Sequence, residues 1–565
     1  MNFNFESKQF KYLICILLLF SITLTVFQYT VQIREPWMGD QLNYNWIGNK
    51  TGNDHQILTA ETLKFTENWY REGPVNLKFA MLENPKSIEF PTLSSRNPYT
   101  SYLPGAIVPI YLISELQGHD PTPSMIMEYN LINHFLIAFF LSLLIFFFLR
   151  QLKVDYVNSF LFSTLPIFIE LLLPAPLYWH QNVYFSDQAV ILPFVLFIFL
   201  EVIRPAAADK KLMVINIFQY FLMFYGILTD WFFVFVIMVV YIKRIFEGEI
   251  FKGSIWTFLK SSLIYWAIPL ITVYLYILQL TLLGTFNQAI DRFFLRTGTS
   301  ADGIDYTNIF LTRIQEFMYP GYGEIITLAL VISIITVLLC VIILFILKIK
   351  RDEVKKISGL IAIILVPCII QMIIFKNHTI MHEFSVLKLS IPLATIPFVL
   401  FPVLLFFIFK NLNTFYISLN FKKHSLKFNY VLFIVFLITA AFTSFNVLSE
   451  HNGYHNFFST DSNNYQELGN SIQKNTQYND ILFSPDLEII GYSQIGCSQI
   501  ELAYSMKEVY RINSLDDIKE KIKGINGDYR IVVLLVGSAW ENKPANTTLI
   551  KDGKYYYYIV DPKTL

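Results

Sequence analysis

Residues 131–150 show what decides the fold of this chain, because they read LINHFLIAFFLSLLIFFFLR and carry no charge before the terminal Arg150. A helix that crosses the hydrocarbon core of a membrane needs about 20 apolar residues. Comparable runs recur along the chain, and the sequence therefore predicts a polytopic α-helical membrane protein. The 11 predicted spans begin near Lys11, Leu131, Val157, Ala189, Leu212, Trp231, Phe258, Ile325, Ile357, Leu389 and Tyr430.

The composition of the 565 residues supports this fold class. Hydrophobic residues make up 54% and charged residues only 15%, whereas soluble proteins have about 25% charged residues. Lys and Arg total 43 and Asp and Glu total 43. Because no basic excess is available to meet phosphates, nucleic acid is excluded as the main partner. The four cysteines, Cys15, Cys340, Cys368 and Cys497, show no metal-binding or redox spacing.

The apolar run over residues 212–241 is too long for one span and short for two. Asp230 lies at its centre, and basic residues flank both ends. Basic residues favour the cytoplasmic side, so both ends are expected there and the chain is expected to turn outside near Asp230. The sequence predicts two short helices. The flanking residues are Lys210 and Lys211 before the run and Lys243 and Arg244 after it.

The same charge rule, applied to every short loop, predicts a cytoplasmic N-terminus and an extracytoplasmic C-terminus. We expect a transmembrane module over residues 1–448, whose first extracytoplasmic loop is 33–129, and a soluble extracytoplasmic domain over 449–565. Strand and helix patterns at 480–484, 515–525, 529–536 and 555–560 predict that this domain is a small α/β unit. In the first loop, residues 60–71 are expected to form a helix lying on the membrane surface, with Leu63, Trp69 and Tyr70 facing the lipid.

The ionisable residues fall at the outer ends of helices and in outer loops, which suggests a reaction site at the outer face. Three carboxylates are candidates. Asp40 follows the first span, and its alternative role is a hydrated or helix-capping carboxylate. Asp187 lies in a short outer loop, where solvation or capping is again the alternative. Asp230 lies at the tight outer turn, where capping of the next span is the alternative.

Residues 376–388 are dense in groups that can act chemically. His378 and His382 are spaced i, i+4 and would share a helical face that could bind a metal; alternatively, both bond to backbone or lipid headgroups. Lys388 enters the next apolar run, where it either snorkels or meets an anion. Arg96, Arg292 and Arg296 are further outer cations. Arg292 and Arg296 share a helical face suited to a phosphate, and a solvated basic face is the alternative.

These pieces, in this order and on one side, resemble the GT-C class of membrane glycosyltransferases, and most closely the protein O-mannosyltransferase and aminoarabinose-transferase branch (family 39-like). The matching stretches within residues 10–410 are Gly39-Asp40-Gln41 with Tyr44, residues 96–105, Leu228-Thr-Asp-Trp231 and residues 378–384. The resemblance implies that Asp40 is the catalytic carboxylate and Asp187 the second outer acid. It also implies that His382 and Lys388 meet the lipid phosphate. Gln41 stands where the mannosyltransferases often carry a second acid.

The function that this resemblance implies is transfer of a hexosyl or pentosyl group from a polyprenyl-phosphate donor to a protein, lipid or glycan acceptor. Its setting would be the cell membrane and envelope. Since the leaving group is a phosphate, one base, Asp40, suffices to take the acceptor proton, and a single displacement inverts the anomeric carbon. Asp187 and Asp230 would position the acceptor or a metal, while Arg96, Arg292, Arg296, His382 and Lys388 would bind phosphate. No cofactor is required; a divalent metal remains open, with Asp40, Asp187, His378 and His382 as ligands. The alternative function is a multi-pass transporter or flippase.

Overall fold

The structure is a computed structural model, and it describes residues 8–38, 56–250, 254–299, 307–346, 352–411, 465–486, 505–525, 527–537, 539–540, 543–544 and 546–562. Contacts divide the chain into two compact units. The first, here called the helical unit, comprises Met1–Trp37, Glu128–Tyr276 and Ile290–Phe457. The second, the α/β unit, comprises Met38–Met127, Ile277–Ala289 and Phe458–Leu565. This division places the predicted first loop with the predicted C-terminal domain.

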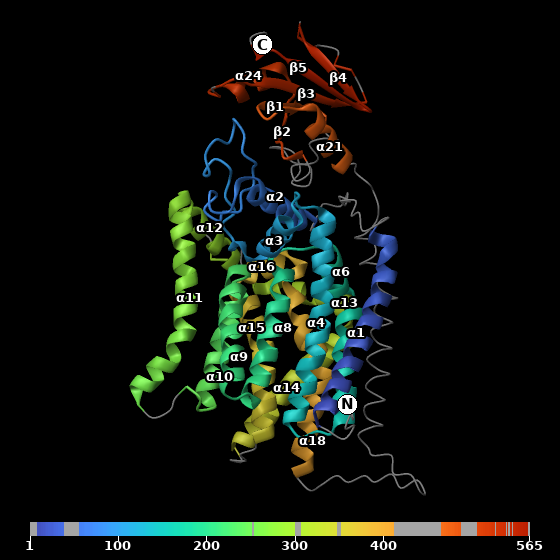
Figure 1. The fold of residues 1–565 in the computed structure, drawn as a ribbon, viewed down its shortest axis with the longest axis vertical. Helices are drawn as coiled ribbons and strands as arrows, with labels where there is room; N and C mark the ends of the chain where they lie inside the picture. Colours follow the sequence, from blue (N-terminus) through green and yellow to red (C-terminus); the bar gives the residue numbers. More distant parts are fainter. Residues whose placement is uncertain are drawn as a thin grey trace, which may run out of the picture. The chain divides into compact units, whose positions relative to one another are not determined.

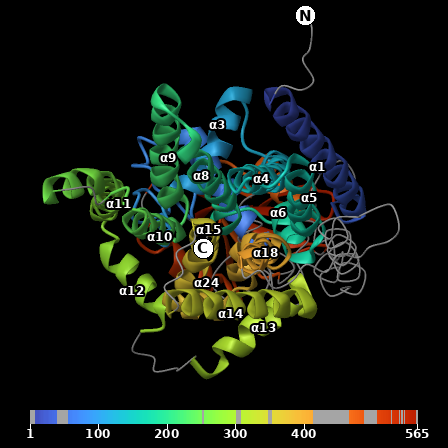
Figure 2. The ribbon, with the colours of Figure 1, turned by 90° about the horizontal axis from the view of Figure 1, so that it is seen from below.

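The helical unit is built from long apolar helices, which Figure 1 shows from the side and Figure 2 largely end on. Helix α11 and helix α12 continue from one unit into the other. The elements are α1 (Lys8–Met38), α4 (Pro123–Gln151), α5 (Tyr156–Leu172), α6 (Pro174–Asn182), α7 (Ser186–Ala189), α8 (Ile191–Ile203), η3 (Arg204–Ala206), α9 (Asp209–Thr229), α10 (Phe232–Phe246), α11 (Ile255–Leu283), α12 (Phe286–Thr297), α13 (Thr307–Tyr322), α14 (Glu324–Ile346), α15 (Asp352–Ile374), α16 (Lys376–Met381), η4 (Glu383–Leu389), α17 (Ser390–Thr395), η5 (Ile396–Leu400) and α18 (Phe401–Asn411).

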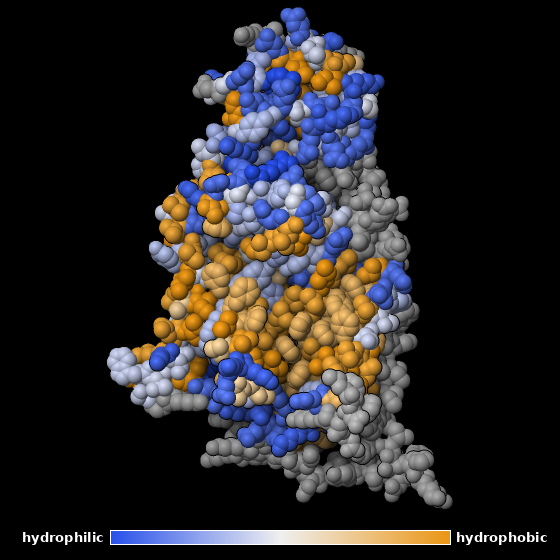
Figure 3. All heavy atoms as spheres, viewed as in Figure 1, coloured by the Kyte–Doolittle hydropathy of each residue, from blue (hydrophilic) through white to orange (hydrophobic). Residues whose placement is uncertain are grey.

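The predicted class, a polytopic α-helical membrane protein, is confirmed. Among the described residues, 8 helices are long and apolar enough to span a membrane, or 9 when the bent pair α5–α6 counts as one span. Helix α10 accounts for a tenth predicted run, but its 15 residues extend only about 22 Å. The run near Tyr430 lies outside the described residues. The apolar surface of these helices forms the broad orange band in Figure 3.

The predicted break at Asp230 is confirmed, since α9 ends at Thr229 and α10 begins at Phe232. Gly226, in the last turn of α9, lets the two helices approach closely: a Cβ atom there would lie 2.2 Å from Cγ of Phe233. The backbone N–H of Asp230 donates to the Gly226 carbonyl at 2.9 Å. Close packing at this glycine therefore helps to fix the position of Asp230.

The first part of the α/β unit consists of α2 (Gln56–Glu72), η2 (Pro104–Ala106), α3 (Val108–Gln117) and the loop between α2 and η2. A helix was expected over 60–71 and is present, but its expected place on the membrane surface is wrong. Leu63 and Trp69 are buried, and the Trp69 indole donates to the Ala80 carbonyl at 2.8 Å. The apolar face of α2 packs against the loop that follows it.

Arg96 holds this loop together. Its guanidinium is buried and donates to both carboxylate oxygens of Glu72, at 3.0 and 2.7 Å. It also donates to the side-chain oxygen of Asn68 and to the main-chain oxygen of Asn84, each at 2.9 Å. A bidentate pair of this kind is a strong, directional contact. The geometry favours this structural role over the phosphate contact expected for Arg96.

The C-terminal part of the α/β unit contains both helices and a sheet, as the sequence predicts. Its five-stranded sheet has the order β2-β1-β3-β5-β4, with parallel pairs β1–β2 and β1–β3 and antiparallel pairs β3–β5 and β4–β5. The elements are α21 (Tyr465–Asn475), β1 (Asp480–Ser484), β2 (Val509–Arg511), α24 (Leu515–Ile522), β3 (Arg530–Val536), β4 (Thr548–Asp552) and β5 (Tyr555–Val560).

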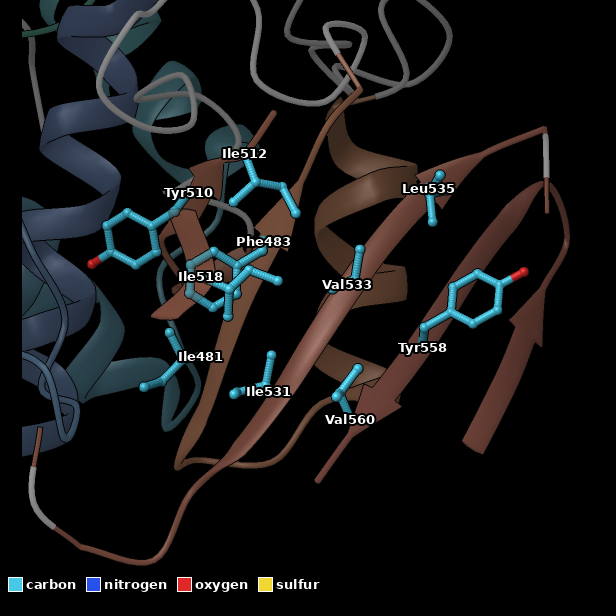
Figure 4. Close-up of a cluster of buried hydrophobic side chains, with 10 residues drawn as sticks. All are labelled: Ile481, Phe483, Tyr510, Ile512, Ile518, Ile531, Val533, Leu535, Tyr558 and Val560. Carbon is cyan, nitrogen blue, oxygen red and sulfur yellow. The ribbon is translucent and has the colours of Figure 1, made fainter. Parts of the chain in front are cut away.

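Both faces of this sheet are covered, because successive side chains of a strand point to opposite faces. Ile531, Val533 and Leu535 of β3 belong to the cluster that includes Ile518 of α24, shown in Figure 4. Val532 and Leu534 belong to the opposite cluster, which includes Leu468 and Ile472 of α21. Strand β3 is thus central and apolar on both sides. Ile88 of the first loop packs against the α24 side.

The close approach at Gly226 yields a paired prediction. Gly226→Ala should destabilise the protein by about 1–3 kcal/mol, because the new methyl group would overlap the buried Phe233 ring. Gly359→Ala in α15 is the matched control: its Cβ would lie at ordinary contact distance from side-chain atoms of Lys243 and Glu247, the nearest at 3.5 Å. Thermal unfolding in detergent measures both. Equal melting temperatures for the two variants would contradict this account of the α9–α10 packing.

Candidate functional site

Three of the predicted site residues meet in one buried cluster in the helical unit. The ammonium nitrogen of Lys388 lies 2.8 Å from a carboxylate oxygen of Asp230, and it also forms an ion pair and a hydrogen bond with Asp187. The side chains of all three residues are nearly inaccessible to solvent. The two aspartates and the lysine come from three separate stretches of sequence, and nothing in the sequence pattern predicted that they would join. We call them the Asp-Lys-Asp cluster.

Short and irregular elements present these three side chains. Asp187 belongs to the four-residue helix α7. Asp230 has extended backbone angles between α9 and α10, and it accepts a hydrogen bond from the Phe232 N–H at 2.8 Å. The N-cap residue of α10 is Trp231, so Asp230 lies one position before the cap expected of it and accepts from the first N–H of the helix while also binding Lys388. Lys388 belongs to the 3-10 helix η4, and its ammonium lies 5.6 Å from the centre of the Phe232 ring.

Further polar contacts complete the cluster. Gln371 of α15 donates to Asp230 at 3.2 Å, a contact that sequence reasoning missed. A lone glutamine within an otherwise apolar helical run was the available signal. The Cys368 thiol donates to the Lys388 carbonyl at 3.4 Å. Cys368 and Gln371 lie on neighbouring turns of α15, so this helix braces the cluster.

The charge of the Asp-Lys-Asp cluster determines what it can do. Two carboxylates and one ammonium leave a formal charge of minus one. Removing one partner of a buried ion pair leaves an uncompensated charge, which is strongly destabilising. Lys388 is already enclosed by two carboxylates, which would repel a phosphate. The geometry thus favours Lys388 as the group that holds Asp187 and Asp230 together, rather than as the phosphate ligand expected from the sequence.

The predicted histidine pair lies at the junction of α15, α16 and η4. The rings of His378 and His382 are 4.7 Å apart between centroids, but α16 ends at Met381 and His382 has extended backbone angles. His382 stacks on Phe384, with centroids 4.9 Å apart. Burial, and then the nearby positive charge of Arg296, hold the pKa of the His378 imidazole well below its ordinary value. His378 is therefore neutral at physiological pH.

Metal binding gains no support within the described part of the chain, where His, Cys, Asp and Glu nowhere form a group of three that could hold an ion. Asp187 is engaged by Lys388. Asp40, both the proposed base and a candidate ligand, lies outside the described residues. Asp187, His378 and His382 therefore stay predictions as metal ligands.

Helix α12 carries the two remaining candidate cations. Asn377 donates to the Leu295 carbonyl at 2.9 Å, and the rings of Phe293 and Phe375 lie 6.1 Å apart. These contacts fasten α12 to the start of α16. Arg296 then lies near enough to act electrostatically on both His378 and Asp187, whereas Arg292 is exposed to solvent. Arg296 thus acts on the histidine pair, whereas the basic face that Arg292 was expected to share with it stays a prediction.

No model of a known protein family matches the chain, and no curated protein sequence matches it. Its fold matches solved structures. ArnT from Cupriavidus metallidurans bound to undecaprenyl phosphate matches at 9% identity with a TM-score of 0.52, over 96% of this chain and 97% of that chain. The apo oligosaccharyltransferase of Archaeoglobus fulgidus matches at 10% identity with a TM-score of 0.53, over 91% and 69%. AglB from the same archaeon, in complex with an inhibitory peptide and a dolichol-phosphate, matches at 8% identity with a TM-score of 0.52, over 91% and 69%. ArnT and AglB are both GT-C glycosyltransferases, and the predicted GT-C-like fold is confirmed.

The Asp-Lys-Asp cluster predicts a non-additive pattern of stabilities. Lys388→Met should destabilise the protein by about 3–5 kcal/mol, because it leaves two adjacent buried carboxylates unpaired. Adding Asp187→Asn to Lys388→Met should restore part of that loss, since it removes one of the two charges. Thermal unfolding of both single variants and the double variant gives the coupling energy.

Arg313→Met is the control for this comparison, because it breaks an exposed ion pair with Glu316 and should cost less than about 1 kcal/mol. Additive effects of Lys388→Met and Asp187→Asn would contradict the proposed coupling.

Proposed function

We propose that this protein is an integral-membrane glycosyltransferase that uses a polyprenyl-phosphate sugar as donor. The observation that supports the proposal best is the match of fold over nearly the whole chain to ArnT bound to undecaprenyl phosphate. The AglB structure, which contains a dolichol-phosphate and an inhibitory peptide, points to the same donor class. We further propose that the transferred group is a hexosyl or pentosyl unit and that the acceptor is a protein, lipid or glycan on the extracytoplasmic face.

Asp40 is the proposed general base. The donor is already activated, because its leaving group is a phosphate. The acceptor hydroxyl attacks the anomeric carbon, its proton passes to the carboxylate, and the bond between that carbon and the phosphate oxygen breaks. One displacement of this kind inverts the configuration at the anomeric carbon. A positioned base of this type contributes about 10²–10⁴-fold to rate.

The departing phosphate needs positive charge or hydrogen-bond donors. Arg296 and Arg292 on α12, with His382 as a neighbouring donor, are the proposed phosphate contacts. Asp187 is the proposed positioning acid, held in place by Lys388, and Asp230 supports the same arrangement. For Arg96 and Lys388, which the sequence had suggested for the phosphate, we propose structural pairing instead, because Arg96 binds Glu72 and Lys388 binds Asp187 and Asp230.

A multi-pass transporter or flippase is the second candidate. One observation favours it: Glu170 is fully buried in the bent span α5–α6. Transporters use broken helices and buried ionisable groups of this kind. The two candidates differ in chemistry, because only a transferase forms a new glycosidic bond.

The proposed base leads to a direct test. Purified wild type should transfer radiolabelled sugar from one of a panel of polyprenyl-phosphate sugars, and Asp40→Asn should lower kcat by about 10²–10⁴-fold. Asp54→Asn, in the same predicted loop, is the matched control and should keep wild-type activity. Melting temperatures should agree for all three proteins.

Each assay is run with and without EDTA. Activity that EDTA leaves unchanged supports a metal-independent transferase, whereas its loss would place Asp40, Asp187 and His382 in a metal site. An active Asp40→Asn protein would remove the base assignment. The contrary outcome is a wild type that transfers no sugar from any donor but moves the intact donor across the membrane of proteoliposomes. That result would replace the transferase hypothesis with the flippase hypothesis.

A further inference from the structure

A second group of buried polar side chains lies where α5 meets α6, and the proposed transfer chemistry does not use it. The two helices form a bent span whose halves meet at 63°. Glu170 of α5 and His180 of α6 are both 0% exposed, and His180 Nε2 lies 4.0 Å from Glu170 Oε1. Within the described residues, neither ring nitrogen of His180 has a hydrogen-bond partner, and the Ser390 hydroxyl is the neutral polar group nearest to the Glu170 carboxyl.

His134 of α4 stacks on His180, with ring centroids 5.2 Å apart and planes at 21°. The Gln181 amide nitrogen lies 3.2 Å from His134 Nδ1, so Nδ1 accepts a hydrogen bond. His134 Nε2 lies 3.1 Å from the Glu170 main-chain oxygen, so Nε2 donates. This pattern fits a neutral ring with its proton on Nε2. His134 therefore contributes no charge to the Glu170–His180 pair.

Among the described elements that pack most against α5 and α6, none supplies a counter-charge to the pair. α17 and η5, which pack against α5, carry no ionisable side chain. Elements η4 and α13 pack against α6. Lys388 of η4 is enclosed by Asp187 and Asp230. The Tyr322 hydroxyl of α13 donates to the Val386 carbonyl at 3.1 Å. The other charges of these two elements are Glu383, which faces Arg313, and Glu316, which pairs with Arg313.

An ionised carboxylate in an apolar interior is costly unless it is paired and hydrogen-bonded. An acid that keeps its proton beside a neutral imidazole avoids that cost. We propose that Glu170 holds a proton at neutral pH. With neutral His180 it then acts as a positioning pair that keeps α5 and α6 packed together at their bend.

The pair sits between the segments that bear the Asp-Lys-Asp cluster. Helix α6 leads through residues 183–185 into α7, which carries Asp187. On the other side, the Ser390 hydroxyl lies close to the Glu170 carboxyl, and Ser390 follows the η4 helix that carries Lys388. Ionisation of Glu170 would place a bare carboxylate between these segments and favour their separation. Its effect on catalysis rests on the proposed function.

The test compares full-length wild type with Glu170→Gln, Glu170→Ala and the exposed-carboxyl control Glu316→Gln. Glutamine keeps a neutral donor of similar shape but has no proton to lose. The infrared difference spectrum of wild type minus Glu170→Gln near neutral pH should show the carbonyl band of a protonated carboxylic acid, whereas that of wild type minus Glu316→Gln should not. The melting temperature of wild type should fall as pH rises through ionisation of Glu170, whereas that of Glu170→Gln should not.

The transfer rate should follow the same pH dependence: wild type loses activity on the alkaline limb and Glu170→Gln retains it. Glu170→Ala should lower kcat by about 10- to 100-fold at every pH, through misplacement of the segments beside it. An infrared carbonyl band of equal intensity in wild type and Glu170→Gln, or a melting profile in this variant that follows wild type, would overturn the proposal. These two readouts decide it even if wild type transfers no sugar, the result that would remove the proposed function alone.

Discussion

A single lysine ammonium, held between two carboxylates away from water, connects the parts of the candidate site in the helical unit. Lys388 pairs with Asp187 and Asp230, and these residues come from η4, α7 and the turn between α9 and α10. Each charge alone would be expensive in an apolar interior, and together they are stable only in this arrangement. The positions of three otherwise unrelated segments are therefore coupled to one another.

The long apolar helices depend on backbone hydrogen bonding rather than on this ion pair. Within a membrane every backbone polar group must be satisfied internally, so long apolar stretches become helices. Departures from regular helix occur where the polar residues gather: at the α9–α10 turn, at the α5–α6 bend and through α16, η4 and α17. Irregular backbone at these places allows side chains from different helices to converge. Candidate chemistry and broken helices thus coincide in this protein.

Much of the fold followed from sequence periodicity. The break at Asp230 was predicted from one carboxylate within an apolar run flanked by basic residues, and strands β1 and β5 from their β-rich composition. The α2 helix was predicted, but not its burial, because an amphipathic pattern does not say whether lipid or protein covers the apolar face. Arg96 shows the same limit: its exposed-cation role was inferred from position, while Glu72 and Asn68 enclose it in the structure.

The sequence by itself determined the class of fold, the approximate span positions and which residues are able to carry chemistry, because these depend on hydrophobicity and local periodicity. Only the tertiary structure decided which of those residues meet. Asp187 and Lys388 are separated by 201 positions, and Gln371 and Asp230 by 141. Their pairing depends on how helices pack, a property of the whole chain that no local pattern encodes.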